Sequence, residues 1–75
     1  MTAQVEIHLG RAEGSLIRLL GLAERRGYNP IRVSSFPLNH RALRVRLTVE
    51  SHRPLDQFLK QLDKLYDVFS VQRVG

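Results

Sequence analysis

The feature that most constrains the fold is a hydrophobic pattern that occurs twice along the chain. Residues 4–9 alternate strictly between apolar and polar side chains, as a half-buried strand does, and residues 43–49 alternate in the same way. Each strand is followed by an apolar stripe at helical spacing and then by a second extended segment. Equivalent positions are separated by nearly equal lengths of chain: Val5 and Leu43, Leu16 and Leu55, and Val33 and Val71.

The first helix is predicted over residues 15–26. Its apolar stripe is formed by Leu16, Leu19, Leu20 and Ala23. Gly14 and Ser15 supply the N-terminal cap region, and Gly27 suits a left-handed C-terminal cap. Arginines at positions 25 and 26 lie in the last turn, where cations interact favourably with the helix dipole.

The second half contains a longer apolar stripe. Pro54 suits the first turn of a helix, and the stripe that follows comprises Leu55, Phe58, Leu59, Leu62, Leu65 and Tyr66. Asn29-Pro30 predicts a turn, residues 31–36 a strand and residues 37–40 a hairpin connection. Residues 67–74 form the last predicted strand.

The order of elements is therefore strand, helix, strand, strand, helix, strand. Two such halves with right-handed crossovers predict an α+β, ferredoxin-like βαββαβ sandwich. The sheet is expected to be four-stranded and antiparallel, with both helices on one face. The first and third strands should be central and the second and fourth should be edges. Residues 1–75 are expected to form one domain.

Composition limits what this domain can be. A chain of 75 residues builds a thin core, and the absence of cysteine excludes disulfides and thiolate metal sites, so association with another copy is the expected support. No secretory signal or membrane span is visible, which favours a cytoplasmic location and no membrane partner. The net charge of +5 suits an acidic partner, or a solvated surface of scattered arginines.

The chain lacks the residues needed for three functions that such folds can have: RNA binding, metal binding and catalysis. An RNA-binding sheet needs aromatics on its central strands, whereas the exposed positions there are Gln4, Glu6, His8, Arg44, Arg46 and Thr48, so nucleic acid is an unlikely partner. His8, His40 and His52 have no metal-ligand spacing, and no metal site is predicted. No catalytic triad or carboxylate pair is evident, so no catalytic residue is assigned and the chain is not expected to be an enzyme.

The loop between the first strand and the first helix remains the best candidate for a binding site. Gly14 followed by Ser15 could place free backbone N–H groups at a helix N-terminus, where a carboxylate would be stabilised. Gly14 could equally serve only to make the turn. The residues themselves leave both interpretations open.

Two segments carry a resemblance to a known family. Residues 14–22, followed by Arg26-Gly27-Tyr28-Asn29, resemble the first half of the ACT domain of acetolactate (acetohydroxyacid) synthase small subunits. That family reads Gly-x-Leu-x-Arg-Val and then Arg-Gly-Tyr-Asn. Leu47-Thr48-Val49 and residues 61–68 look like the end of the same domain. Since the chain ends at Gly75, the short single-domain type of subunit is the more similar one.

The resemblance implies a regulatory subunit that activates or stabilises a catalytic large subunit in branched-chain amino acid (isoleucine, valine and leucine) biosynthesis. Thiamine diphosphate, Mg²⁺ and FAD would belong to that partner, and this chain would hold no cofactor. A stand-alone ACT-like module that senses amino acids or associates with nucleic acid is the alternative.

The same resemblance suggests site residues. An amino-acid effector would contact Arg11, Gly14, Ser15 and Asn29. Because unpaired strand edges invite pairing, a homodimer is expected to form along Ile31, Val33 and Ser35 of the second strand. Valine-sensitive members have Asn where this chain has Arg11, so the amide that orients the amino acid is lost. Weak or absent sensitivity to valine is therefore expected.

Overall fold

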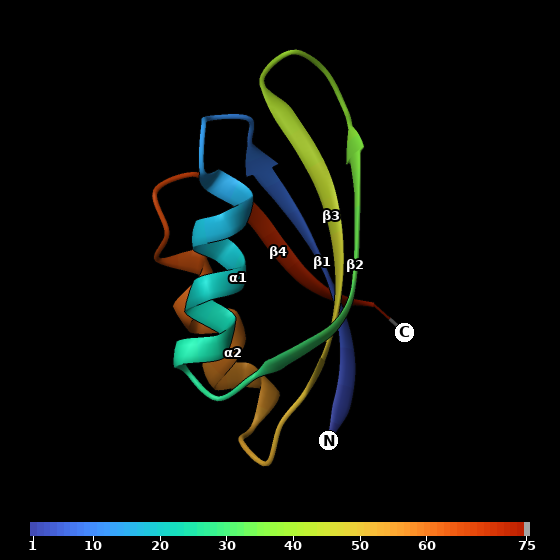
Figure 1. Ribbon diagram of the computed structural model, residues 1–75, viewed down its shortest axis with the longest axis vertical. Coiled ribbons are helices and arrows are strands. Elements are labelled where there is room, and N and C mark those ends of the chain that lie inside the picture. Colours follow the sequence, from blue (N-terminus) through green and yellow to red (C-terminus); the bar gives the residue numbers. More distant parts are fainter. Residues whose placement is uncertain (75) are drawn as a thin grey trace.

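The computed structural model describes residues 1–74 and confirms the predicted order of elements. The bounds are β1 Thr2–Gly10, α1 Ser15–Arg25, β2 Asn29–Pro37, β3 Ala42–Glu50, α2 Leu55–Asp63 and β4 Val68–Val74. The strands form one antiparallel sheet in the order β2-β3-β1-β4, so β1 and β3 are central as expected. Figure 1 shows both helices on the same side of this sheet. The ferredoxin-like fold is confirmed.

The core lies between the central strands and the helices. The helix-facing apolar side chains of β1 and β3 are completely buried: Val5, Ile7, Leu9, Val45, Leu47 and Val49. Leu19 of α1 and Phe58 and Leu62 of α2 pack against them from the helix layer. Tyr28 stacks on Phe58 with ring centroids 4.4 Å apart. Both apolar stripes predicted from the sequence therefore meet in one core.

The C-terminal end of α1 has the predicted glycine cap. Gly27 has φ of +85°, the left-handed conformation that glycine adopts without steric cost. The amide of Tyr28 donates a hydrogen bond to the carbonyl of Ala23 at 2.8 Å, which closes the helix and turns the chain into β2. The helix itself ends at Arg25, one residue before the predicted boundary.

The end of α2 differs from the prediction. The helix ends at Asp63, and Tyr66 is 82% exposed instead of lying on the apolar stripe. The amides of Lys64 and Leu65 bond to carbonyls only three residues earlier, which tightens the winding and turns the next side chains out of helical phase. The assignment of Tyr66 to the core was wrong.

Two further boundaries differ from the prediction. Asn29 and Pro30 belong to β2, because they pair with Glu50 and Val49 of β3, so the predicted turn there was wrong. Pro54 precedes α2 as its N-terminal cap and does not lie in the first turn. Proline is tolerated in an edge strand such as β2, where one side of the backbone has no partner.

Candidate functional site

The four residues expected to bind an effector do not come together within one chain. Arg11, Gly14 and Ser15 lie in or beside the loop between β1 and α1 (Figure 1, top). Asn29 begins β2 and pairs with Glu50, which in turn pairs with Thr2, at the opposite end of the sheet. A single chain therefore presents two separate parts of the expected site.

The start of α1 is already filled by groups of the chain itself. Gly14 has φ of +79°, which explains why glycine is needed at this turn. The amide of Ser15 donates to the carbonyl of Ala12 at 3.1 Å, and the Ser15 residue is only 2% exposed. The Ser15 amide, one of the N–H groups expected to receive a carboxylate, is thus engaged in the loop.

An ion pair between Arg18 and Asp67 covers this helix start. The Arg18 Nη2 donates to Asp67 Oδ2 at 2.9 Å, to Ser15 Oγ at 3.3 Å and to the Tyr66 hydroxyl at 3.2 Å. The guanidinium also lies 5.7 Å from the centre of the Tyr66 ring. Arg18 therefore joins α1 to the segment that enters β4.

Asp67 is the buried member of the pair, with 4% of its surface exposed. Burial by itself raises the pKa of this carboxyl, but hydrogen bonds from Ser15 and Arg18 outweigh that effect and leave the pKa below its ordinary value. The hydrogen bond to Asp67 also raises the pKa of Arg18. A carboxylate from the same chain thus lies beside the first residue of α1.

Sequence reasoning missed Arg18 and Asp67 as partners. Both lie inside the segments that resemble the family, at the Arg of Gly-x-Leu-x-Arg and in Asp67-Val68. Their place in these segments was the available signal, but the two residues lie far apart in the sequence, so the segments alone did not predict their contact.

Arg11 extends away from the start of α1. Its Nη1 donates to the carbonyl of Asn39 at 3.0 Å, and its amide donates to the carbonyl of Arg41 at 2.9 Å. The Asn39 side chain in turn accepts from the amides of Arg41 and Ala42. Arg11 therefore connects its loop to the β2–β3 hairpin.

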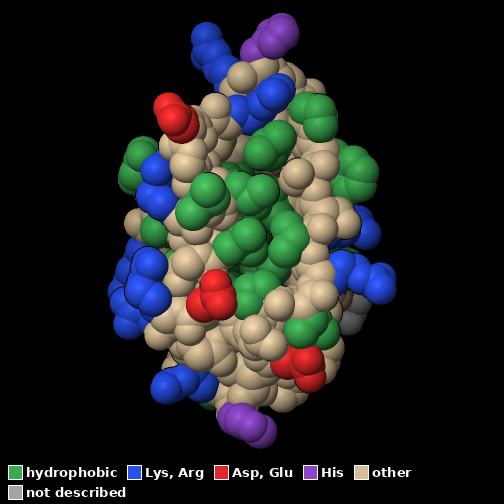
Figure 2. All heavy atoms as spheres, in the orientation of Figure 1, with side chains coloured by type: hydrophobic (Ala, Val, Ile, Leu, Met, Phe, Trp, Pro, Cys, Tyr) green, Lys and Arg blue, Asp and Glu red, His purple; other side chains and the backbone are tan. Residues whose placement is uncertain are grey.

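The residues expected at the dimer interface lie on the outer strand β2, whose position at the sheet edge was correctly predicted. Ile31 and Val33 are 48% and 38% exposed, and Ser35 is also exposed. Leu16 and Leu20 of α1 are only partly buried against the core. Figure 2 shows hydrophobic side chains gathered in a stripe between α1 and β2 on this face.

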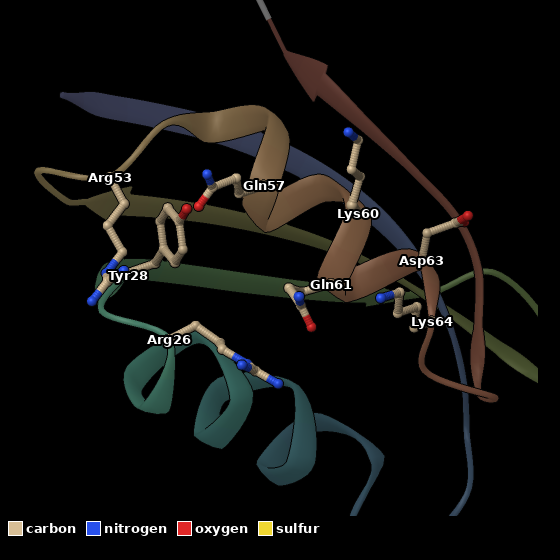
Figure 3. Close-up of a pocket in the computed structure, with 8 residues that line it drawn as sticks. All are labelled: Arg26, Tyr28, Arg53, Gln57, Lys60, Gln61, Asp63 and Lys64. Atoms are coloured by element: carbon tan, nitrogen blue, oxygen red, sulfur yellow. The ribbon is translucent and has the colours of Figure 1, made fainter.

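A basic groove of about 430 Å³ separates the end of α1 from α2 (Figure 3). Its lining residues are Arg26, Tyr28, Arg53, Gln57, Lys60, Gln61, Asp63 and Lys64. Figure 3 shows Gln61 pointing toward α1, whereas Lys60 and Asp63 extend away on the other side of α2. The polar groups diverge, so the groove provides no converging ligand set.

Within residues 1–74, no group of three or more His, Asp or Glu side chains is arranged to hold a metal ion. Neither helix among these residues is long and apolar enough to cross a membrane.

Comparison with known proteins agrees with this architecture. The sequence profile of the ACT domain matches residues 11–71, and the chain belongs to the ACT domain family. It is 33% identical over 73 residues to the acetolactate synthase small subunit of Buchnera aphidicola subsp. Schizaphis graminum (strain Sg). The match covers 95% of this chain but only 46% of that protein, so the chain spans about half the length of this relative.

Solved structures of similar fold include the ACT domain from GTP pyrophosphokinase of Chlorobium tepidum. Its crystal structure superposes with a TM-score of 0.81, covering 99% of this chain and 97% of that one at 17% identity. Its solution structure gives a TM-score of 0.80, also at 17% identity, with 100% and 86% of the two chains covered. At this level of identity the likeness supports the fold alone.

Proposed function

We propose that this chain acts as a regulatory small subunit of acetolactate synthase and has no catalytic site of its own. The observation that carries the proposal is the match to a small subunit of that enzyme along 95% of the chain. The partner would be the catalytic large subunit, which would hold thiamine diphosphate, Mg²⁺ and FAD. The role would lie in branched-chain amino acid biosynthesis.

The proposed mechanism is differential contact with the large subunit. A bound subunit can shift the large subunit toward a competent state only by as much as it prefers that state. The rigid, fully buried core of β1 and β3 suits such a role, because it holds the exposed surfaces in a fixed arrangement.

A homodimer formed along β2 would complete the regulatory unit. The outer edge of β2 has unpaired backbone groups, and the exposed Ile31 and Val33 side chains would be buried by a second copy. Antiparallel pairing around Val33 would bring Asn29 of the second copy beside Pro37 of the first.

That pairing would also reunite the two parts of the effector site. Pro37 pairs with Leu43, and Leu43 pairs with Leu9, so this row lies at the same end of the sheet as Gly14. Gly14 of one copy and Asn29 of the other would then approach each other. An amino-acid effector would bind between the copies, and Arg11 would reduce its affinity for valine.

The test is to mix the purified chain with the matching large subunit and to measure acetolactate formation at saturating concentrations. We expect the rate to rise and the two proteins to elute together in size-exclusion chromatography. Equal rates with and without this chain, in the presence of a demonstrated complex, would contradict the regulatory role. Failure to form any complex would favour an ACT module with another partner.

A further inference from the structure

No helix covers the face of the sheet opposite α1 and α2 (Figure 1). The pairing of the strands arranges its residues in rows: Arg32, Ser34 and Phe36 on β2 lie opposite Thr48, Arg46 and Arg44 on β3. On β1 the same rows continue with Gln4, Glu6 and His8. The aromatic residue of these rows, Phe36, lies on the edge strand β2 and not on a central strand.

These rows enclose a hollow of about 380 Å³, lined by Gln4, Arg32, Ser34, Phe36, Arg44 and Arg46. The register explains its shape. Ser34 is the smallest of these residues and lies between Arg32 and Phe36 on the same face of β2. A short side chain surrounded by long ones leaves a depression whose floor carries a hydroxyl group.

The charges around this hollow are only partly compensated. Arg46 Nε donates to Glu6 Oε1 at 3.1 Å, whereas neither Arg32 nor Arg44 makes an ion pair with any residue of the described chain. Like charges on neighbouring strands repel each other unless an anion intervenes. Two guanidinium groups therefore remain available to one anionic ligand.

Arg44 gives a second, independent indication. Its guanidinium lies 5.4 Å from the centre of the Phe36 ring, which holds the group in place. Its Nε is buried and, within residues 1–74, has no hydrogen-bond partner. An anion beside this guanidinium would offset part of the cost of burying its positive charge.

We propose that this hollow, which we name the Ser34 pocket, binds a phosphate group. Guanidinium groups present planar sets of N–H donors that match phosphate oxygens, and charge-assisted hydrogen bonds of this kind are the strong ones. Arg32 of β2 and Arg44 of β3, which make no ion pair within the described chain, would contact the phosphate oxygens from two strands, and the Ser34 hydroxyl would donate from the floor. The three arginines suit the charge and tetrahedral oxygens of a phosphate better than a single flat carboxylate.

The phosphate could be carried by a small phosphate monoester or by the backbone of a single-stranded nucleic acid. The pocket lies away from the loop assigned to the effector, but it shares β2 with the proposed dimer edge, where Arg32 and Ser34 lie on the sheet face opposite Val33. Its test measures phosphate binding to this chain and needs no large subunit, so its failure is distinguishable from failure of the proposed regulatory role.

The experiment is a titration of the ¹⁵N-labelled full chain with inorganic phosphate, followed by NMR at constant ionic strength set with sodium chloride. Saturable shifts are expected at the amides of Ser34 and Arg46. Arg32→Gln should weaken binding by at least about fivefold, since it removes a charge-assisted contact. Its matched control is Arg26→Gln, which removes the same charge from the groove between the helices and should change the affinity by less than about twofold.

Shifts that do not saturate, or equal losses in both variants, would overturn the proposal, because either result indicates only general attraction to a basic protein. Circular dichroism should confirm that Arg32→Gln retains the fold, since Arg32 is exposed. Glycerol phosphate and a single-stranded oligonucleotide then distinguish the source. Saturable competition with inorganic phosphate by the monoester alone indicates a small ligand. Competition by the oligonucleotide alone, with a steep salt dependence, indicates a nucleic acid backbone.

Discussion

The helix-facing side of the sheet has two regions that differ sharply in burial. On the central strand β1, Val5, Ile7 and Leu9 are entirely inaccessible to solvent. On the edge strand β2, Ile31 and Val33 are 48% and 38% exposed, although Val33 pairs directly with the fully buried Leu47. Apolar residues of similar type thus have opposite environments on neighbouring strands.

The helices cover the central strands, which are therefore stabilised by residues of the same chain. We call the central strands, together with the residues of α1 and α2 that pack on them, the covered region. The helices leave β2 less protected, and an exposed apolar edge strand readily pairs with another chain. Substitutions in the covered region should change folding, whereas substitutions on β2 should change association.

The largest effect is expected in the covered region, for Leu62→Ala. Leu62 is fully buried in the core, so its truncation removes buried apolar surface and leaves a cavity. The free energy of unfolding should fall by about 2–5 kcal/mol, measured by urea denaturation. An unchanged denaturation curve would mean that α2 does not pack on the sheet as described.

The exposed region should respond differently to Val33→Asp. Charge on β2 should abolish the proposed dimer, whereas the matched substitution Phe69→Asp on the opposite edge strand should leave it intact. Sedimentation at micromolar concentration measures both. A wild-type chain that is already monomeric would rule out the dimer, and dissociation by Phe69→Asp alone would move the interface to β4.

The covered region was also the easier one to predict from the sequence. Strict alternation on β1 and β3 indicates strands, because side chains on opposite faces meet opposite environments. The stripes around Leu19 and Leu62 indicated the helix faces for the same reason. The error at Tyr66 arose because the apolar spacing of α2 continues to this residue in the sequence, whereas the helix ends at Asp63.

The candidate sites were harder to predict, because their residues are remote in sequence. Gly14 and Asn29 match the family motif, yet they lie at opposite ends of the sheet, which the motif alone does not reveal. Asp67 was assigned to the last strand, but β4 begins at Val68, and the Asp67 carboxylate forms an ion pair with Arg18 of α1. Such contacts depend on how the two halves pack together.

Valine binding tests whether the two copies complete a site at the end of β2. Arg has donors only, whereas Asn also offers an acceptor for the ammonium group of an amino acid. Arg11→Asn should therefore strengthen valine binding by about tenfold, measured by calorimetry. Arg11→Ala is the control, since it also removes the contact with Asn39 but adds no amide. Tight binding of valine by the unmodified chain would show that the amide is not the deciding contact.

The smallest effect is expected from Asp67, a carboxylate buried beside the start of α1. The pKa of Asp67 is lowered in the folded chain despite its burial, because Ser15 and Arg18 hydrogen-bond to the ionised form. As the pH falls, the unfolded chain therefore binds this proton first. The stabilisation is complete above the ordinary pKa of 3.8 and is lost as the pH falls through the lower pKa of the folded chain.

Urea denaturation at several acidic pH values should show a shallower loss of stability for Asp67→Asn than for the wild type. Asp63→Asn, at the exposed end of α2, is the matched control and should follow the wild-type curve. If Asp67→Asn also followed that curve, the ion pair with Arg18 would not contribute to the stability of the folded chain.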